Sequence, residues 1–294
     1  MTIPSLNLLL QSIVNGILMG GVYSLVAIGL SLIFGVMNII NFAHGSFMML
    51  GMFTTYWVYV LLGIDPYLSL LFSIPVLFVI GLVIERFLIA YILDAPEYNQ
   101  LLLTLGVSLF IENLALFLWS PNFRTLEIPY LSKAVTVGTL TMSLPKLIAF
   151  LFAVILTVIL YYFLKSTDLG KAIRAVSEEK EGSLTVGINL RRIYYLAFGI
   201  GAACVGAAGT LTAPFFYISP QVGSVFVILA FVIVVLGGMG NFIGAFFGGL
   251  IVGLAESVGA AFIPGQLKQF IIYFIFVVVL LFKPAGLFGK AHEQ

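Results

Sequence analysis

Two carboxamides and an imidazole stand three residues apart in the segment NIINFAHGSFMML, which is otherwise largely apolar. They belong to Asn38, Asn41 and His44, and the hydroxyl of Ser46 follows one glycine later. These groups donate and accept hydrogen bonds, and none of them is a carboxylate or an ammonium. The segment therefore suits contact with a neutral or zwitterionic solute better than contact with an ion.

Catalytic chemistry is poorly supported by the residue types present. The chain has two histidines and no HExxH metal-binding motif, and its single cysteine, Cys204, is expected to fill space between helices. His44 and Ser46 are neighbours on one backbone, and such neighbours rarely reach the geometry of a nucleophile and its base. No metal site and no bound cofactor are predicted, and an enzyme is the least favoured class.

Composition indicates that these residues lie in a lipid bilayer and not in water. Apolar residues make up 62% of the 294-residue chain and charged residues only 9%, against roughly a quarter charged residues in soluble domains. Several apolar runs have about 20 residues, the length at which a helix crosses a bilayer. The net charge of +1, without a basic cluster, gives no reason to expect nucleic acid as a partner. The sequence therefore predicts an all-α, polytopic membrane protein.

The apolar runs predict eight or nine membrane crossings within a single transmembrane domain over residues 1–294. The expected ranges are 8–34, 46–63, 67–93, 101–119, 147–164, 194–217, 222–236, 244–262 and 267–282. The number stays open because the short pieces around 35–63 and 237–262 could be half-helices. In the loop at 120–146, the alternating piece TVGTLTMSL predicts a small β-hairpin outside the lipid.

Lysine and arginine in the short loops indicate the orientation of the chain. The loop at 165–192 holds more of them than any other loop, and the C-terminal tail adds Lys283 and Lys290. Both segments are therefore expected in the cytoplasm, and the 120–146 loop is expected on the outer side. With nine crossings, the N-terminus lies outside and the C-terminus lies inside.

Polar groups inside a bilayer are costly, so each of them needs a reason. The segment at 38–46 is either a polar turn at the membrane surface or a broken helix whose freed backbone groups and amides line a solute path. Glu112 and Asn113 in the fourth run either line that path or bond another helix, and Asn241 follows a second, glycine-rich break. Glu256, near the end of the eighth run, is expected to extend to the membrane surface.

Glycines spaced four apart predict close helix packing, because small residues let two helix backbones approach each other. The pattern occurs at Gly16 and Gly20, and again at Gly240, Gly244 and Gly248. The segment LGGMGNFIGAFFGG also repeats the form of the opening stretch, with a glycine break, an asparagine and a second apolar run. That likeness suggests an internal repeat in which two broken helices meet near the midplane.

The strongly charged segment at 165–192 is typical of a helix that lies beside the membrane. Apolar positions alternate with charges, Asp168 or Ser166 would cap its start, and Gly187 would end it. Such a helix needs a surface on which to pack. It either covers the protein's own cytoplasmic face or docks onto a partner.

Within this loop, Glu181, Gly182, Ser183 and Gly187 match in part a pattern of ABC-importer permeases, Glu-Ala-Ala followed after three residues by Gly. Both alanines are replaced by small residues, and the Ile-x-Leu-Pro of the full pattern is missing. The runs GGVYSLVAIGLSLIFGVMNIINFAHGSFMMLGMF, RAVSEEKEGSLTVGIN and VVLGGMGNFIGAFFGGLIVGLAE resemble the branched-chain amino acid permeases of the hydrophobic amino acid uptake family. The likeness covers nearly the whole chain and is greatest to the LivH-type subunit.

This resemblance implies an ABC importer permease fold in a bacterial inner membrane. It also implies an assembly with a second, non-identical permease subunit, two cytoplasmic ATPases and an extracytoplasmic substrate-binding protein. ATP and Mg²⁺ would be held by the ATPases, because this chain has no GxxxxGK[ST] phosphate loop. The expected ATPase-coupling residues are Arg174, Glu178, Glu181, Gly182, Ser183 and Gly187.

Two classes of function follow. The favoured one is the permease of an ATP-driven importer for branched-chain or other hydrophobic amino acids, with alternating access around the break at 38–46. The alternative is an importer of the same family that carries urea, short amides or aromatic acids, or an ion-coupled transporter or channel that works without ATP. An ion-coupled protein needs ionisable groups on its path, and Glu112, Glu256 and His44 are the candidates.

Overall fold

The computed structural model describes residues 5–262 and 268–289, and most of them are helical. Seven of the described helices are long and apolar enough to cross a bilayer: α1 (Leu6–Met37), α2 (His44–Leu62), α3 (Leu70–Phe87), α4 (Glu97–Trp119), α5 (Leu144–Ser166), α8 (Leu190–Thr212) and α10 (Phe242–Phe262). The third of these continues into a short 3-10 helix, η1 (Ile89–Tyr91), and two shorter apolar helices are α9 (Val222–Gly237) and α11 (Lys268–Phe282). The all-α, polytopic membrane fold expected from the sequence is confirmed.

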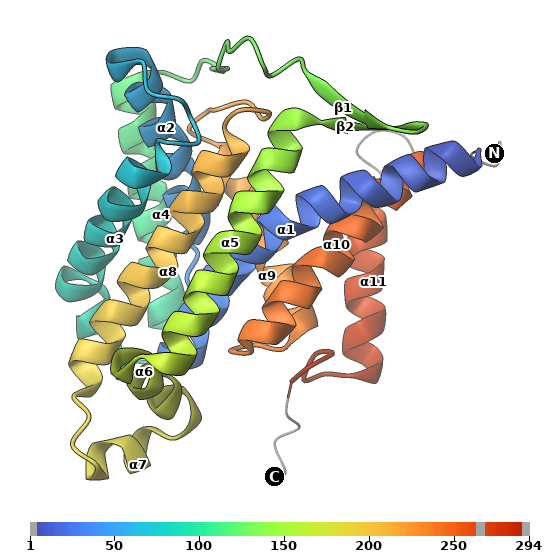
Figure 1. Cartoon of the computed structure of the whole chain (residues 1–294). Coiled ribbons are helices and arrows are strands. Elements are labelled where there is room, and N and C mark those ends of the chain that lie inside the picture. The colour runs from blue at the N-terminus through green and yellow to red at the C-terminus, as the bar shows by residue number, and fades with distance from the viewer. Residues whose placement is uncertain (1–4, 263–267, 290–294) are drawn as a thin grey trace.

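Figure 1 shows different structures at the two ends of the helix bundle. At one end, β1 (Ala134–Val137) and β2 (Leu140–Ser143) form an antiparallel hairpin, as the alternating sequence predicts. At the other end lie two short helices, α6 (Asp168–Glu178) and α7 (Lys180–Thr185). We refer to these as the hairpin end and the α6–α7 end.

The loop that precedes the hairpin ties the connections at its end of the bundle together. Arg124 and Ile218 form an isolated antiparallel bridge, which joins this loop to the connection between α8 and α9. The Tyr130 hydroxyl donates to the carboxylate of Asp65 in the connection between α2 and α3. Burial, together with this carboxylate, raises the pKa of Tyr130. The loop therefore fixes the hairpin-end termini of four different helices.

The charged loop forms two helices, whereas its sequence predicts one. The Thr167 hydroxyl, and not the side chain of either neighbour, caps α6 by accepting a hydrogen bond from the Gly170 N–H at 3.0 Å. The backbone becomes extended at Glu179, whose carboxylate caps α7 by accepting from the Glu181 N–H at 3.3 Å. A second capping residue thus starts a second helix. Gly187 follows α7 with a φ of 82°, a left-handed conformation that favours glycine.

Direct backbone contact joins α1 to α10. A Cβ atom added at Gly16 or at Gly20 would lie 2.8 Å from an α-carbon of α10, and one added at Gly253 would lie 2.5 Å from the α-carbon of Gly20. Only glycine permits such an approach. The Tyr23 hydroxyl donates to the Glu256 carboxylate across the same contact at 2.8 Å. The expectation that Glu256 extends to the membrane surface is therefore wrong, because an interhelical hydrogen bond holds it.

The glycines of the second break lie in two other contacts. Gly244 and Gly248 are in α10 and face α9, and a Cβ atom at Gly248 would lie 2.9 Å from the Ile233 carbonyl oxygen. Gly240 has a φ of 77° and lies against Gly35 in the last turn of α1, where an added Cβ atom would be 3.0 Å from the Gly35 α-carbon. The connection between α9 and α10 thus lies next to the end of α1.

Helix contacts follow an approximate two-fold pattern. Helix α3 packs on α8 as α10 packs on α1, and in both pairs a glycine, Gly81 or Gly253, touches the partner helix. Helices α2 and α9 meet through Gly45 and Gly223. The structural counterpart of the connection between α1 and α2 is thus the connection between α8 and α9. The internal repeat expected from the sequence had matched it instead to LGGMGNFIGAFFGG, the connection between α9 and α10.

Candidate functional site

The connection between α1 and α2 is a helix break inside the protein. Helix α1 ends at Met37, its C-cap Asn38 is left-handed with a φ of 55° and a ψ of 34°, and α2 begins only at His44. Asparagine tolerates this conformation better than most residues. The side chains of Ile39, Asn41 and His44 are fully buried. Of the two interpretations of the sequence, the broken helix fits the structure and the surface turn does not.

Two contacts place the start of α2 near the middle of the bundle. His44 Nε2 lies 2.9 Å from the carbonyl oxygen of Val26, which stands eleven residues, about 16 Å, before the last residue of α1. Ser46 Oγ lies 2.9 Å from Ser108 Oγ, and Ser108 is eleven residues from either end of α4. The first turn of α2 therefore lies at membrane depth, where non-helical backbone is tolerated only inside protein.

Side chains replace part of the hydrogen bonding that the broken helix loses. The Thr104 hydroxyl donates to the carbonyl oxygen of Ile40 at 3.0 Å. The Asn41 Oδ1 atom accepts a hydrogen bond from the Ala43 N–H at 3.0 Å. Each such bond matters because an unpaired buried backbone group costs about 1–3 kcal/mol. The non-helical segment is thus held by α4 on one side and by its own amide on the other.

Two polar atoms of the break are left without a partner. Asn41 Nδ2 and His44 Nδ1 are buried, and neither has a hydrogen bond within residues 5–262 and 268–289. Buried polar atoms in native proteins nearly always have partners, so each exception calls for an explanation. Inside a bilayer, such groups commonly mark the path of a solute. The break therefore has hydrogen-bonding capacity that its own fold does not use.

A row of polar side chains on α4 runs along the break. Thr104, Ser108 and Glu112 are spaced four residues apart, which places them on one face of the helix. Thr104 bonds the backbone of Ile40, Ser108 contacts Ser46, and Glu112 is half-buried one turn further on. Thr104 and Ser108 were not predicted as site residues. Their positions four and eight residues before Glu112, one and two helical turns away, are the signal that could have found them.

Three of the predicted pathway residues do not join this group. The side chain of Asn38 is exposed. Asn113 is exposed on the outer face of α4 and donates to a carbonyl oxygen of its own helix at 2.8 Å. Asn241 donates to the carbonyl oxygen of Phe288 at 2.7 Å and accepts the N–H of Gly244 at 2.9 Å, so it fastens the C-terminal segment to the start of α10.

The starts of α2 and α9 meet beside the polar row. Gly45 and Gly223 are so close that a Cβ atom added to either would overlap the backbone of the other. From this contact, α2 runs toward the hairpin end, whereas α9 ends at the connection that touches Gly35. The N-terminal end of a helix carries a partial positive charge. Two such ends therefore face the same region at membrane depth.

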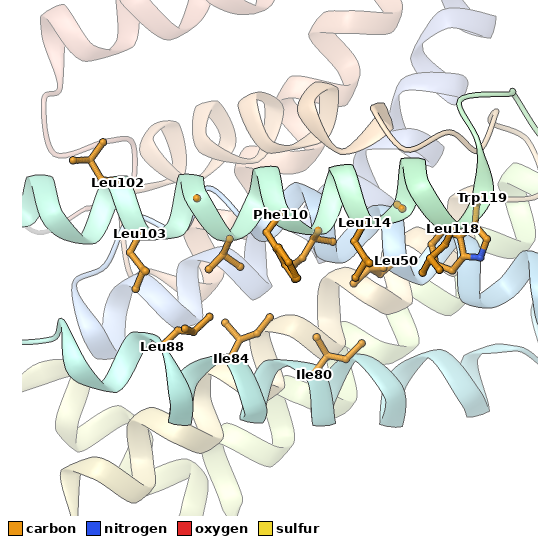
Figure 2. Close-up of a pocket in the computed structure, with 14 residues that line it drawn as sticks. Leu50, Ile80, Ile84, Leu88, Leu102, Leu103, Phe110, Leu114, Leu118 and Trp119 are labelled. Carbon is orange, nitrogen blue, oxygen red and sulfur yellow. The ribbon is translucent and has the colours of Figure 1, made fainter.

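A cavity of about 530 Å³ lies between α3 and α4 on the other side of the polar row. Figure 2 shows aliphatic and aromatic side chains of both helices pointing into it, among them Ile80 and Ile84 from α3 and Phe110 and Leu114 from α4. Neither Asn41 nor any other polar group of the break lines this cavity. It offers a hydrocarbon surface, and the polar chemistry lies elsewhere.

The α6–α7 end presents a second surface of interest. Helix α6 is fastened to the bundle, because Ile173 and Val176 are buried and Arg174 Nε donates to the carbonyl oxygen of Leu164 at 3.0 Å. Helix α7 and the turn after it project from this surface. Leu184 is 55% exposed and Val186 is 75% exposed. Two neighbouring apolar side chains are therefore exposed at the tip of the α6–α7 end.

The predicted coupling residues around these side chains fall into two groups. Glu178, Glu181, Gly182 and Gly187 are exposed beside Leu184. Ser183 is buried, and its hydroxyl donates to the Glu179 carbonyl oxygen at 2.7 Å, so it stabilises α7 from within. Arg174 is exposed, but its guanidinium also bonds the end of α5. The surface is therefore formed mainly by α7 and the turn that follows it.

A bundle of apolar helices around a polar break at membrane depth defines a membrane transport protein. A sequence model described as "branched-chain amino acid transport system / permease component" matches residues 12–280. The chain therefore belongs to this permease family, and the resemblance in its motifs is confirmed. No solved structure matches the chain.

Individual relatives cover almost the whole chain. It is 30% identical to the high-affinity branched-chain amino acid transport system permease protein LivH of Escherichia coli, over 97% of both chains. It is 31% identical to the corresponding protein BraD of Pseudomonas aeruginosa, over 99% of both chains. The permease protein LivM of Escherichia coli is 30% identical over 49% of this chain and 34% of its own length.

Replacing Thr104 by valine is expected to destabilise the break, because the carbonyl oxygen of the half-buried Ile40 then loses its side-chain donor. The expected loss is about 1–3 kcal/mol of folding free energy, measured as a lower thermal unfolding midpoint of the purified protein in detergent. Thr54→Val is the matched control, since the Thr54 hydroxyl bonds only the carbonyl oxygen of Leu50 in its own helix. Equal midpoints for the two variants would contradict the assignment.

Proposed function

We propose that this chain forms the solute path of an ATP-driven importer for branched-chain or other hydrophobic amino acids. The observation that carries the proposal is the break at 38–43, with the unpartnered buried atoms of Asn41 and His44 beside a polar row on α4. Family membership supports the class of solute, since LivH and BraD are named as branched-chain amino acid permeases. Ser46, Ser108 and Glu112 complete the polar lining.

The path is closed in this structure at two contacts near the middle of the bundle. Gly45 touches Gly223 through backbone atoms, and the Ser46 hydroxyl contacts that of Ser108. Alternating access requires that a closed contact opens toward one side of the membrane and then toward the other. Helix α4 is suited to move, because much of its surface is exposed and few polar contacts hold it. We assign the opening step to separation of α4 from the start of α2.

The proposed assembly includes a second permease, two cytoplasmic ATPases and an extracytoplasmic binding protein. A related but different permease protein, LivM, exists in the organism that contains LivH, which supports a non-identical second permease. The chain lacks a phosphate-binding loop, which supports ATP and Mg²⁺ being held by the ATPases. The whole chain, residues 1–294, acts as one transmembrane permease domain in a bacterial inner membrane.

The α6–α7 end faces the cytoplasm under this proposal. The loop at 165–192 is rich in lysine and arginine, which favours that side. The hairpin, in the loop at 120–146, then lies outside together with the N-terminus, and the C-terminus lies inside. The ATPases dock on α7. Leu184 and Val186 enter an apolar groove of the ATPase, and the exposed Glu178 and Glu181 lie around these two side chains.

Charged residues at the tip of this surface should prevent docking of the ATPases. The double variant Leu184→Asp/Val186→Asp is expected to lose at least nine tenths of the co-purifying ATPase, because carboxylates do not enter an apolar groove. Thermal unfolding should stay unchanged, since both side chains are exposed. Val137→Asp, at a 60% exposed position of the hairpin, is the control. Normal ATPase recovery with the double variant would refute the assignment.

Uptake by the complete importer tests the proposed function. The chain is purified from native membranes with its partners, reconstituted in liposomes, and supplied with its binding protein. Uptake of L-leucine is expected only when ATP is present on the side of the ATPases. Purification of the chain alone, with leucine uptake driven by an ion gradient and no ATP, would establish an ion-coupled transporter instead.

A further inference from the structure

Glu112 carries a carboxylate for which the described residues provide no partner. It lies fifteen residues into the 23-residue helix α4, about 10 Å from the hairpin-end terminus of that helix. In the described part of the chain it has no hydrogen bond and no ion pair, in contrast to Glu256, which accepts a hydrogen bond from Tyr23. A carboxylate at membrane depth ordinarily has a partner. The partner of Glu112 therefore comes from outside the described chain.

The start of α2 supplies the opposite polarity close by. In its first turn, the His44 N–H donates to the carbonyl oxygen of Asn41, and the Phe47 N–H donates to that of Ala43. The N–H groups of Gly45 and Ser46 have no acceptor among the described residues. These free donors lie at the positive end of α2, which meets the start of α9 at Gly45 and Gly223. The amide of Asn41 also sits at this helix start, because its Oδ1 atom accepts the Ala43 N–H. Its buried and unpartnered Nδ2 is a further donor there.

The offset along α4 between Ser108 and Glu112 is on the scale of an amino acid. Ser108 contacts Ser46 in the first turn of α2, and Glu112 follows Ser108 by one helical turn, a rise of about 6 Å. A free α-amino acid carries an ammonium and a carboxylate on the same carbon atom, so its charges are a few ångströms apart. The Ser46–Ser108 contact lies between the poles, at the place where the path is closed.

We propose that Glu112 binds the ammonium group of the transported amino acid, while the N-terminal ends of α2 and α9, with Asn41, bind its carboxylate. The inference rests on the proposed function, because it names the polar contacts of the solute on that same path. Solutes with only one of the two charges leave either Glu112 or the helix ends unpaired. The site therefore favours zwitterions over fatty acids and amines of the same shape.

Removal of the charge at position 112 tests this assignment in the complete importer. Glu112→Gln is expected to lower ATP-driven uptake of L-leucine at least tenfold, with the ATPases and the second permease still co-purifying in normal amounts. Glu97→Gln changes the same residue type in the exposed first turn of α4 and is expected to transport like the wild type.

Restoration of the charge separates a charge contact from a structural role. In a Cys204→Ala background, which removes the single native cysteine, Glu112→Cys is expected to be inactive. Reaction with a sulfonatoethyl methanethiosulfonate adds a negative charge and should restore part of the uptake, whereas the trimethylammonium analogue should not. L-Leucine should slow both modifications, because it occupies the same site.

Several results would overturn the inference. Uptake by Glu112→Gln at the wild-type rate would show that the carboxylate is not needed. Loss of the second permease from the preparation would assign Glu112 to a contact between subunits, and equal restoration by both reagents would exclude a role of charge. The proposed function is judged separately, from the ATP dependence of the wild type. Uptake without ATP would refute the ATP-driven importer, and the uptake rates of Glu112→Gln and the wild type could still be compared.

Discussion

The structure depends on one requirement, that a backbone which leaves helical geometry inside a bilayer must find its hydrogen bonds within the protein. The segment at 38–43 meets it in part through α4, whose Thr104 donates to Ile40, and through the amide of Asn41. His44 reaches back to the carbonyl oxygen of Val26. Helix α4 is thus attached to the bundle through the polar groups of the break as well as through its buried apolar side chains, and its polar row lies where it meets the break.

Glycine contacts give this break a rigid surrounding. Helices α1 and α10, and likewise α3 and α8, are in backbone contact, so neither pair can shift without loss of close packing. Helix α4 has no comparable glycine contact, and a Cβ atom at Gly106 would meet nothing within 4 Å. The molecule therefore combines a tightly packed core with one helix that lacks glycine contacts, and the proposed solute site lies between them.

Hydropathy located the apolar helices but left the number of crossings open at eight or nine, and alternation predicted the hairpin, because both features depend on local patterns. The polar residues at 38–46 were recognised because amides and an imidazole are rare in such a run. Their depth was not predictable, since it depends on the contact between Ser46 and Ser108, two residues far apart in the chain. The bond between Tyr23 and Glu256 was missed for the same reason. In the charged loop, the second cap at Glu179 splits the predicted single helix into two, and hydrophobic periodicity does not reveal such a cap.

A reversible cross-link between α2 and α4 tests the central claim most directly. Cysteines in place of Ser46 and Ser108, in a Cys204→Ala background, would replace two hydroxyls that lie 2.9 Å apart. If these helices separate during transport, oxidation should stop ATP-driven uptake of L-leucine, and a reducing agent should restore it. Wild-type uptake by an importer in which the cross-link has formed completely would contradict the claim that the path opens between α4 and the start of α2.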